Sequence, residues 1–333
     1  MARFGQDSMQ SISKTPLTHE TIQTIVTHHF GAASRLVAAE ELTDGYYNAA
    51  YRLDLADGLR CVLKVAPPAS VRVLRYEQDI MTAEVETIRL VRAHTTMPAP
   101  EILCHDPSHT LIDNEFFIMA FIAGLPFHRL RASLAQEDQQ RIMRQMGAFL
   151  AEMNAISGNA FGYFTPRCPR FGDWRSAFDF MLRGVLADGQ DVSVELSLGY
   201  DALLDLVSQS YAALDEVQSP RLVHWDLWDG NVFIDPATAQ ITGIIDFERS
   251  LWGDPLMEVN FGAFAPLEPD SPLLRGYGRQ MLARSAEKVR RTLYNIYLFL
   301  IMIIECTYRR YPTQDQENWA RRLLAVELDK LQA

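Results

Sequence analysis

Residues 223–248 read VHWDLWDGNVFIDPATAQITGIIDFE, and this stretch carries the most informative pattern of the chain. An apolar start predicts a short strand at 222–223, and a polar loop follows over 224–231. Asp235-Pro236 predicts a turn, because proline presets the first turn dihedral and the carboxylate bonds nearby amides. A second strand is expected over 241–245. Polar side chains from the loop and from the end of the second strand therefore meet at one edge.

The spacing of these polar residues suits phosphoryl transfer. His224, Asp226 and Asn231 fit the frame H-x-D-x-x-x-x-N of the protein-kinase catalytic loop, and Asp246-Phe247 follows the second strand, as Asp-Phe-Gly does there. In such sites one carboxylate orients the attacking hydroxyl, while an amide and a second carboxylate hold the metal ions. The alternative is a β-hairpin with surface carboxylates. Three spaced pieces that agree in order favour the catalytic interpretation.

Two residues depart from the protein-kinase pattern, namely Trp225 in place of arginine and Glu248 in place of glycine. With Gly253-Asp254-Pro255 a few residues on, the stretch resembles the aminoglycoside phosphotransferase and choline kinase-like families, small-molecule relatives of the protein kinases. This resemblance implies an α+β, protein-kinase-like fold of two lobes. A β-rich, nucleotide-binding lobe would occupy 1–120, and a mainly helical lobe with the catalytic loop and acceptor site would occupy 121–333.

Size and composition agree with a globular enzyme of two packed units. The chain has 333 residues, which is long for a single core. Its net charge of −11 argues against nucleic acid as a partner, because nucleic acid binding needs basic surface. Four cysteines are scattered without a C-x-x-C pair, which favours reduced thiols in a cytoplasmic protein over disulfides or a zinc site.

The sequence gives no reason to expect a membrane protein. The first dozen residues are polar and lack the apolar run of a signal peptide. The apolar stretch over 293–304 is shorter than the ~20 residues that a membrane span requires. Arg290, Arg291 and Glu305 flank it. We therefore expect a buried helix there, and no membrane partner.

The N-terminal part predicts one helix followed by strands. The helix is expected from Thr18 to Phe30, and the strands over 35–42, 47–55 and 59–66. Lys64 lies on the third strand between apolar neighbours. A lysine in a strand is usually a surface residue, but these neighbours make simple solvation a poorer explanation. The kinase resemblance implies that Lys64 contacts the α- and β-phosphates of the nucleotide.

Two further segments resemble nucleotide-binding parts of the small-molecule kinases. Gly45, Asn48 and Tyr51 fit their loop G-x-x-N-x-x-Y, whose backbone amides would cradle phosphate. A strand over 116–122 would lead into the hinge between the lobes, although an apolar core explains its phenylalanines equally well. The hinge residues expected to border the adenine of ATP, or the base of GTP, are Met119, Phe121 and Ile122.

A helix expected over 77–92 carries a carboxylate on its apolar face. At about 100° per residue, Glu84 falls within the stripe of apolar side chains, whereas Glu86 points away from it. A carboxylate in such a place is costly unless it is paired. Because protein kinases pair a helix glutamate with the strand lysine, we expect Glu84 to pair with Lys64. The alternative puts Glu84 at the wet edge of the stripe.

The remainder of the chain predicts mostly helix, over 136–156, 273–282, 286–309 and 314–331. Between residues 173 and 216 lie nine acidic residues and two arginines. In the aminoglycoside kinases the equivalent helical segment helps bind a polycationic substrate, so the resemblance implies a cationic acceptor. A solvated acidic face on two amphipathic helices explains the same composition. The sequence leaves both interpretations open.

These observations predict transfer of the γ-phosphate of ATP or GTP to a hydroxyl of a small, cationic molecule such as an aminoglycoside antibiotic. Asp226 would be the catalytic base, Asn231 and Asp246 would hold Mg²⁺, and His224 would support the loop. A choline-like amino alcohol, homoserine or a sugar is an open alternative acceptor. An alternative function is that of a catalytically idle binding module with a kinase fold, although the retention of Lys64 and the loop residues argues against it. No feature fixes the oligomeric state.

Overall fold

A computed structural model describes residues 14–43, 45 and 47–332 of the chain. By their contacts, these residues form two compact units between which the chain passes more than once. One such passage lies between Phe121 and Ile122, in the predicted hinge. The predicted lobe boundary at residue 120 stays a prediction. Within the described part of the chain, the first unit comprises 14–72, 101–121 and 309–312, and the second comprises 73–100, 122–308 and 313–332.

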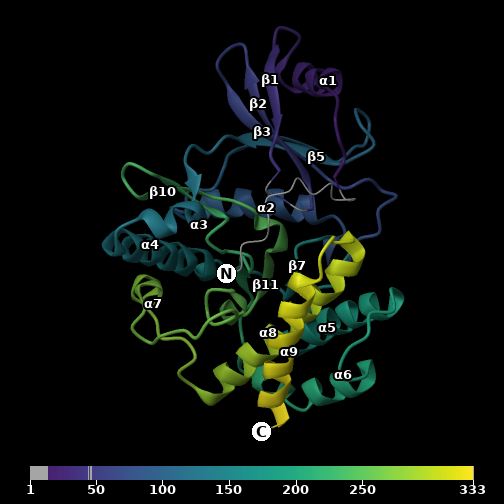
Figure 1. Cartoon of the computed structure of the whole chain (residues 1–333), viewed down its shortest axis with the longest axis vertical. Coiled ribbons are helices and arrows are strands. Elements are labelled where there is room, and N and C mark those ends of the chain that lie inside the picture. The colour runs from purple at the N-terminus through teal and green to yellow at the C-terminus, as the bar shows by residue number, and fades with distance from the viewer. Residues whose placement is uncertain (1–13, 44, 46, 333) are drawn as a thin grey trace. The chain divides into compact units, whose positions relative to one another are not determined.

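The first unit is built on one antiparallel sheet with the strand order β1-β2-β3-β5-β4 (Figure 1). The predicted strands are confirmed, with alternating burial along β2. Lys64 lies on β3, opposite Ala50 on one neighbouring strand and Phe117 on the other. The strands are β1 (Leu36–Glu41), β2 (Ala49–Leu55), β3 (Arg60–Val65), β4 (Ile102–Asp106) and β5 (Phe116–Ala120).

Helix α1 (His19–Phe30) covers this sheet and closes the core of the first unit. The Thr18 hydroxyl accepts a hydrogen bond from the Thr21 N–H at 3.1 Å, which caps the first turn. The helix ends at Gly31, whose φ of 98° suits glycine. Both ends agree with the sequence prediction. The helix residues buried against the sheet are Ile22, Ile25 and Val26.

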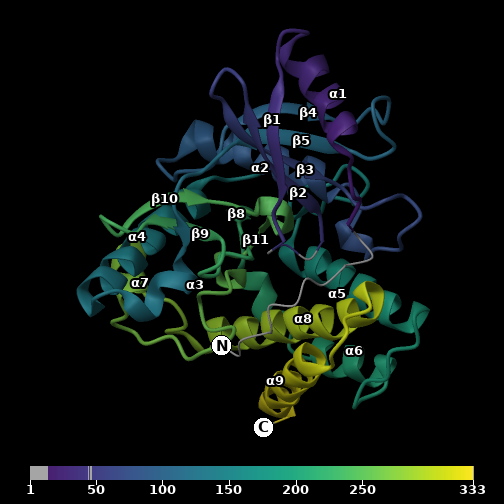
Figure 2. The same cartoon turned by 45° about the horizontal axis from the view of Figure 1, so that its top comes forward.

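The second unit is mainly helical (Figures 1 and 2). Nearly all of its long helices were predicted, because each has an apolar stripe at helical spacing. In both views α5 lies beside α8, and the Trp174 indole of α5 donates to the Tyr294 hydroxyl of α8 at 2.7 Å. The helices are α2 (Ile80–His94), α3 (Phe127–Leu130), α4 (Gln136–Ala155), α5 (Trp174–Asp191), α6 (Tyr200–Ser208), α7 (Pro272–Tyr277), α8 (Ser285–Arg309) and α9 (Asp315–Gln332).

Two small sheets in the second unit present the loop at 224–231. It connects β8 of one sheet (order β7-β11-β8) to β9 of the other (order β10-β9-β6). The turn predicted at Asp235-Pro236 and the strand predicted after it are confirmed, since β9 and β10 pair on either side of this turn. The strands are β6 (Leu125–Pro126), β7 (Gly162–Tyr163), β8 (Arg221–Val223), β9 (Val232–Asp235), β10 (Gln240–Ile244) and β11 (Leu251–Gly253).

A 3₁₀ turn and a left-handed glycine explain where two predicted helix boundaries were wrong. The helix predicted from residue 77 begins at Ile80, because η1 (Arg75–Glu77) precedes it and Asp79 has a φ of 55°. The helix predicted to reach residue 282 ends at Tyr277, where Gly278 adopts a left-handed conformation. Strand β11 was not predicted. The other 3₁₀ turns are η2 (Arg131–Ser133), η3 (Tyr211–Glu216), η4 (Phe247–Arg249) and η5 (Pro255–Met257).

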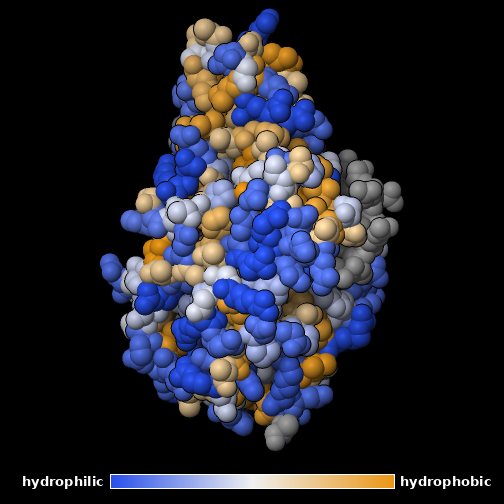
Figure 3. Space-filling model, turned by 90° about the vertical axis from the view of Figure 1, so that its left-hand side faces the viewer, coloured by the Kyte–Doolittle hydropathy of each residue, from blue (hydrophilic) through white to orange (hydrophobic). Residues whose placement is uncertain are grey.

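The apolar stretch over 293–304 lies within α8 and is buried, as predicted. Its flanking charges are buried too, and each has a partner: Arg290 contacts Asp254 at 2.8 Å, and Arg291 donates to the Glu258 carbonyl at 2.9 Å. Within the described residues, no helix is long and apolar enough to span a membrane. On the face shown in Figure 3, hydrophilic residues predominate and hydrophobic ones are scattered among them.

Helices α4 and α7 pack side by side with glycines at the contact (Figures 1 and 2). A Cβ atom on Gly147 of α4 would overlap the Leu273 carbonyl, and one on Gly276 of α7 would overlap the Arg144 carbonyl. The neighbours are backbone atoms, which cannot rotate away. Glycine is therefore required on both helices for this close approach.

We predict that Gly147→Ala lowers the free energy of unfolding by about 1–3 kcal/mol, because overpacking forces the two backbones apart. Gly184→Ala in α5 is the matched control, since a Cβ there meets nothing within 4 Å. The control is expected to be neutral or slightly stabilising, because alanine favours helix by up to ~1 kcal/mol over glycine. Chemical denaturation of both variants measures the difference. Equal stability of the two would contradict this account of the helix contact.

Candidate active site

A buried carboxylate, that of Glu258, fixes the start of the loop at 224–231. It accepts the backbone N–H groups of His224 at 2.8 Å and Trp225 at 3.0 Å. The Asn154 side chain of α4 donates to it at 3.2 Å. Burial raises the pKa of Glu258 to about 7, although these donors favour the ionised form. The Glu258 carboxylate therefore fixes the direction of the backbone just before Asp226.

Trp225 holds an unusual backbone conformation next to Asp226. Its φ is 65°, in the left-handed region that a bulky side chain rarely adopts. The indole is 1% exposed and stacks on Tyr297 of α8, with ring centroids 5.3 Å apart. Its edge contacts Tyr76. Such a strained conformation persists only when the surroundings hold it, and this aromatic packing does so.

His224 is fully buried beneath the loop. Its Nδ1 accepts the Asp226 N–H at 3.3 Å, and its ring packs against Phe247 at 4.5 Å. Burial lowers the pKa of His224 to about 4, so the ring is neutral at pH 7. The hydrogen bond lies within the loop, and the ring contact links the loop to the segment after β10. The supporting role of His224 stays a prediction.

Asn231 ties the two predicted metal-binding segments together. Its side-chain Nδ2 donates to the Asp226 carbonyl at 2.8 Å, and its own carbonyl accepts the Ile245 N–H at 3.0 Å. Ile245 directly precedes Asp246. The loop and the end of β10 are thus joined by a backbone hydrogen bond.

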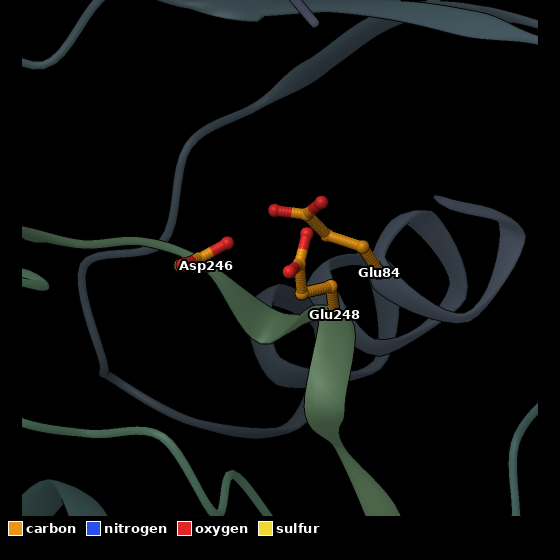
Figure 4. Close-up of side chains that lie close together, drawn as sticks. All are labelled: Glu84, Asp246 and Glu248. Carbon is orange, nitrogen blue, oxygen red and sulfur yellow. The ribbon is translucent and has the colours of Figure 1, made fainter. Parts of the chain in front are cut away.

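Three carboxylates converge at this place (Figure 4). Ligand atoms of Glu84, Asp246 and Glu248 all lie within 4.8 Å of one another. Glu84 comes from α2, while the other two follow β10. Lys64, the predicted partner of Glu84, belongs to the first unit. Glu248 was not predicted as a site residue, although its position two residues after Asp246 indicates a second carboxylate at the same place.

The cluster suits a hard divalent cation. Carboxylates this close repel one another unless a cation or a proton lies between them. Carboxylate and amide oxygens are also the protein ligands that Mg²⁺ accepts alongside phosphate oxygens. Since the Nδ2 of Asn231 is engaged, its Oδ1 is the atom that would face a metal ion. The donor set present here therefore fits Mg²⁺.

Asp226 is partly buried and lies among charged groups. Burial raises its pKa to about 7, Arg249 opposes the shift, and the nearby carboxylates of Asp246 and Glu248 add to it. A bound cation would favour the ionised form and lower this pKa. An aspartate whose pKa lies near neutrality is suited to accepting a proton from a hydroxyl.

An ion pair beside Asp226 was not predicted. Arg249 contacts Glu305 of α8 at 3.2 Å and lies over the Tyr76 ring at 5.9 Å. Gln316 of α9 donates to the same carboxylate at 2.7 Å. The sequence offered no means of placing Glu305, because its partner is 56 residues away. The ion pair ties the site to the C-terminal helices.

The predicted nucleotide-binding residues lie mostly in the first unit. Asn48 is buried and precedes β2, whereas Gly45 lies between two positions outside the described residues. The Phe121 N–H donates to the Arg60 carbonyl at 3.3 Å. Met119 lies on β5. Ile122 begins the segment 122–308 of the second unit and packs against Gly243. These roles stay predictions.

Arginines neutralise much of the acidic segment over 173–216. Five of its nine carboxylates form ion pairs, and three of the five arginines that take part come from outside the segment. Asp188 is the most buried of them, at 2% exposed. Counting charges along the sequence therefore overestimates the negative field. The pairs are Arg75 with Asp188 and Asp191, Arg175 with Asp215, Arg183 with Asp179, and Arg284 and Arg290 with Glu216.

This fold and this constellation define a kinase-like phosphotransferase, an enzyme that uses a hydroxyl group as acceptor. The profile of the Phosphotransferase enzyme family matches residues 38–291, which is more than half of the chain. The chain belongs to that family.

Solved structures show the same fold. A protein of Ralstonia eutropha described as an aminoglycoside phosphotransferase has a TM-score of 0.63 and 16% identity, covering 95% of this chain and 98% of its own. A protein of Thermobifida fusca described as a fructosamine-3-kinase has a TM-score of 0.63 and 18% identity, covering 92% and 98%. The GDP and kanamycin complex of the aminoglycoside phosphotransferase APH(2")-IIIa has a TM-score of 0.61 and 17% identity, covering 93% and 98%.

Two curated relatives are named as acyl-CoA dehydrogenases and not as phosphotransferases. A protein of Arabidopsis thaliana named acyl-CoA dehydrogenase IBR3 is 25% identical over 65% of this chain and 26% of its own length. Acyl-CoA dehydrogenase family member 10 of Mus musculus is 25% identical over 76% of this chain and 22% of its own. The chain thus spans about a quarter of the length of these relatives.

The buried His224 predicts a pH dependence of stability. Its folded pKa of about 4 is below the ordinary value of 6.5, so between these values the unfolded chain binds the additional proton. Stability should therefore fall as the pH drops from 6.5 to 4, by up to about 1.4 kcal/mol per pH unit. Chemical denaturation of the wild type and of His224→Asn across this range measures the effect. Parallel profiles for the two proteins would show that His224 does not cause the loss.

Proposed function

We propose that this chain transfers the γ-phosphate of ATP or GTP to a hydroxyl of a small molecule, with Mg²⁺ bound at the carboxylate cluster. The observation that carries the proposal is the pairing of the loop at 224–231 with the segment at 246–248 in one unit. The hydrogen bond from the Ile245 N–H to the Asn231 carbonyl brings the two together. The nucleotide donor is supported by structural neighbours such as the GDP complex described above.

Each site residue has a role in this proposal. Asp226 orients the acceptor hydroxyl and takes its proton, which a pKa near neutrality permits. His224 holds Asp226 by accepting its N–H, and the stacking of Trp225 on Tyr297 fixes the backbone next to it. Asn231 and Asp246 would hold Mg²⁺, and Glu248 adds a further oxygen ligand. The metal ion supplies charge neutralisation for the phosphates.

The remaining groups would bind the nucleotide. Lys64 would contact the phosphates, and Glu84 would either fix Lys64 or complete the cation site. Gly45 and Asn48 would form the phosphate loop, and the hinge at 119–122 would border the base. In this proposal the nucleotide-binding lobe comprises residues 1–120, and the lobe with the acceptor site comprises 121–333. The kinase resemblance supports these assignments.

Two acceptor classes have support. Structural neighbours named as aminoglycoside phosphotransferases favour a polyamine sugar, and the carboxylates at 173–216 that form no ion pair with an arginine of the described residues would attract its charge. The arginine pairing described above weakens that attraction. The names of the two curated relatives favour a hydroxyl on an acyl thioester instead. A kinase domain that matches part of an acyl-CoA enzyme would act on a related acyl group.

An acceptor panel tests the reaction. Nucleotide consumption is measured with aminoglycosides, amino alcohols, sugars and hydroxyacyl thioesters, and one class is expected to stimulate it. Asp226→Ala should then lower kcat by roughly 10²–10⁴-fold while the nucleotide still binds. Asp329→Ala, on the exposed face of α9, is the control and should leave kcat unchanged. Wild-type turnover in Asp226→Ala would refute the assignment of the base.

The metal assignment makes a separate prediction. A nonhydrolysable ATP analogue should raise the melting temperature only with Mg²⁺, and Asp246→Asn or Glu248→Gln should reduce the shift, because each removes an anionic ligand. Glu86→Gln is the control, since Glu86 is exposed on α2 and pairs with Arg89. Thermal shifts with Mg²⁺ and with EDTA measure the effect. Equal stabilisation in EDTA would remove the cluster from nucleotide binding.

A further inference from the structure

A pocket lies within the second unit, and no residue of the loop at 224–231 lines it. Its volume is about 720 Å³, in the range of small-molecule sites. The C-terminal ends of α2 and α4 line it together with the loop that follows α4 and strand β11. Its apolar lining comes from Leu90, Ile156 and Trp252. Gly158 lies directly against the Trp252 ring, since a Cβ there would be 2.6 Å from it.

The cation of this pocket is Arg170. Its guanidinium donates to the Gly162 carbonyl at 3.1 Å and lies 5.7 Å from the centre of the Phe164 ring. Among the described residues no carboxylate forms an ion pair with it. The Arg170 side chain is exposed to solvent, yet partial desolvation by its surroundings lowers its pKa, whereas the Asp179 carboxylate raises the pKa of Arg183.

The acidic residue of the pocket is already engaged. Glu152 accepts the Thr96 N–H at 2.5 Å and the Thr96 hydroxyl at 2.8 Å. Its oxygens are therefore used to join the end of α2 to α4. His94, in the last turn of α2, adds another polar group to the lining. The pocket thus combines apolar walls with a guanidinium that forms no ion pair with a carboxylate of the described residues.

We propose that this pocket binds a small organic anion, whose carboxylate or phosphate group contacts Arg170 and whose apolar body rests on Leu90, Ile156 and Trp252. Arginine suits both anions, because its planar donors match two oxygens at once. The pocket lies on the elements that carry or follow the carboxylate cluster. Glu84 precedes Leu90 on α2, and Trp252 follows Glu248 by four residues.

The test uses 1-anilinonaphthalene-8-sulfonate, an aromatic anion that fluoresces when bound. The full chain is first saturated with Mg²⁺ and a nonhydrolysable ATP analogue, so that the probe cannot bind in the nucleotide site. Arg170→Met should weaken probe binding by about tenfold or more, and Arg170→Lys by less, because a charge-assisted bond is lost or impaired. Arg167→Met is the matched control, since Arg167 is exposed and pairs with Asp79 at 2.7 Å.

Benzoate and phenyl phosphate then compete with the probe. Displacement by benzoate identifies a carboxylate site, and displacement by phenyl phosphate a phosphate site. The proposal is overturned if the wild type does not bind the probe saturably, or if neither competitor displaces it. Equal affinity in Arg170→Met and Arg167→Met also overturns it. Melting temperatures establish that each variant is folded, and Arg170→Lys supplies the comparison if Arg170→Met is not.

Discussion

The Glu258 carboxylate is the constraint on which the site depends. It is fully buried, and an ionised group there is tolerated only because backbone and side-chain donors surround it. Two of these donors are consecutive N–H groups, so the chain that leads to Asp226 can run in one direction only. The Asn154 amide that completes the set also accepts the Tyr277 hydroxyl at 3.0 Å. The close packing of α4 and α7 thereby supports the position of the loop.

Much of the fold could be predicted because its signals are local. The Thr18 cap, the alternation along β2 and the apolar stripe of α8 each lie within one element. Asp226, Asn231 and Asp246 are separated by only a turn and two short strands. Hairpin pairing then leaves few ways to arrange them. A motif of fixed spacing specified that part of the site before any tertiary contact was known.

What could not be predicted depends on distant partners. Arg75 and Asp188 are 113 residues apart, so the neutralisation of the acidic segment is invisible to a count along the chain. Arg249 and Glu305 meet only because α8 returns beside the loop. The convergence of Glu84 with Glu248 depends on how η4 packs against α2. In each case sequence gives the charge but not its counterpart.

The left-handed conformation at Trp225 limits how the loop can be exchanged between related enzymes. Its backbone is held by the stacking of the indole on Tyr297, which belongs to a helix more than sixty residues further along the chain. A loop transferred without that tyrosine would retain the strained conformation at Trp225 but lack the aromatic stacking that stabilises it. An exchange of this loop must therefore include both segments. Otherwise position 225 needs a residue, such as glycine, that adopts a positive φ without stabilising contacts.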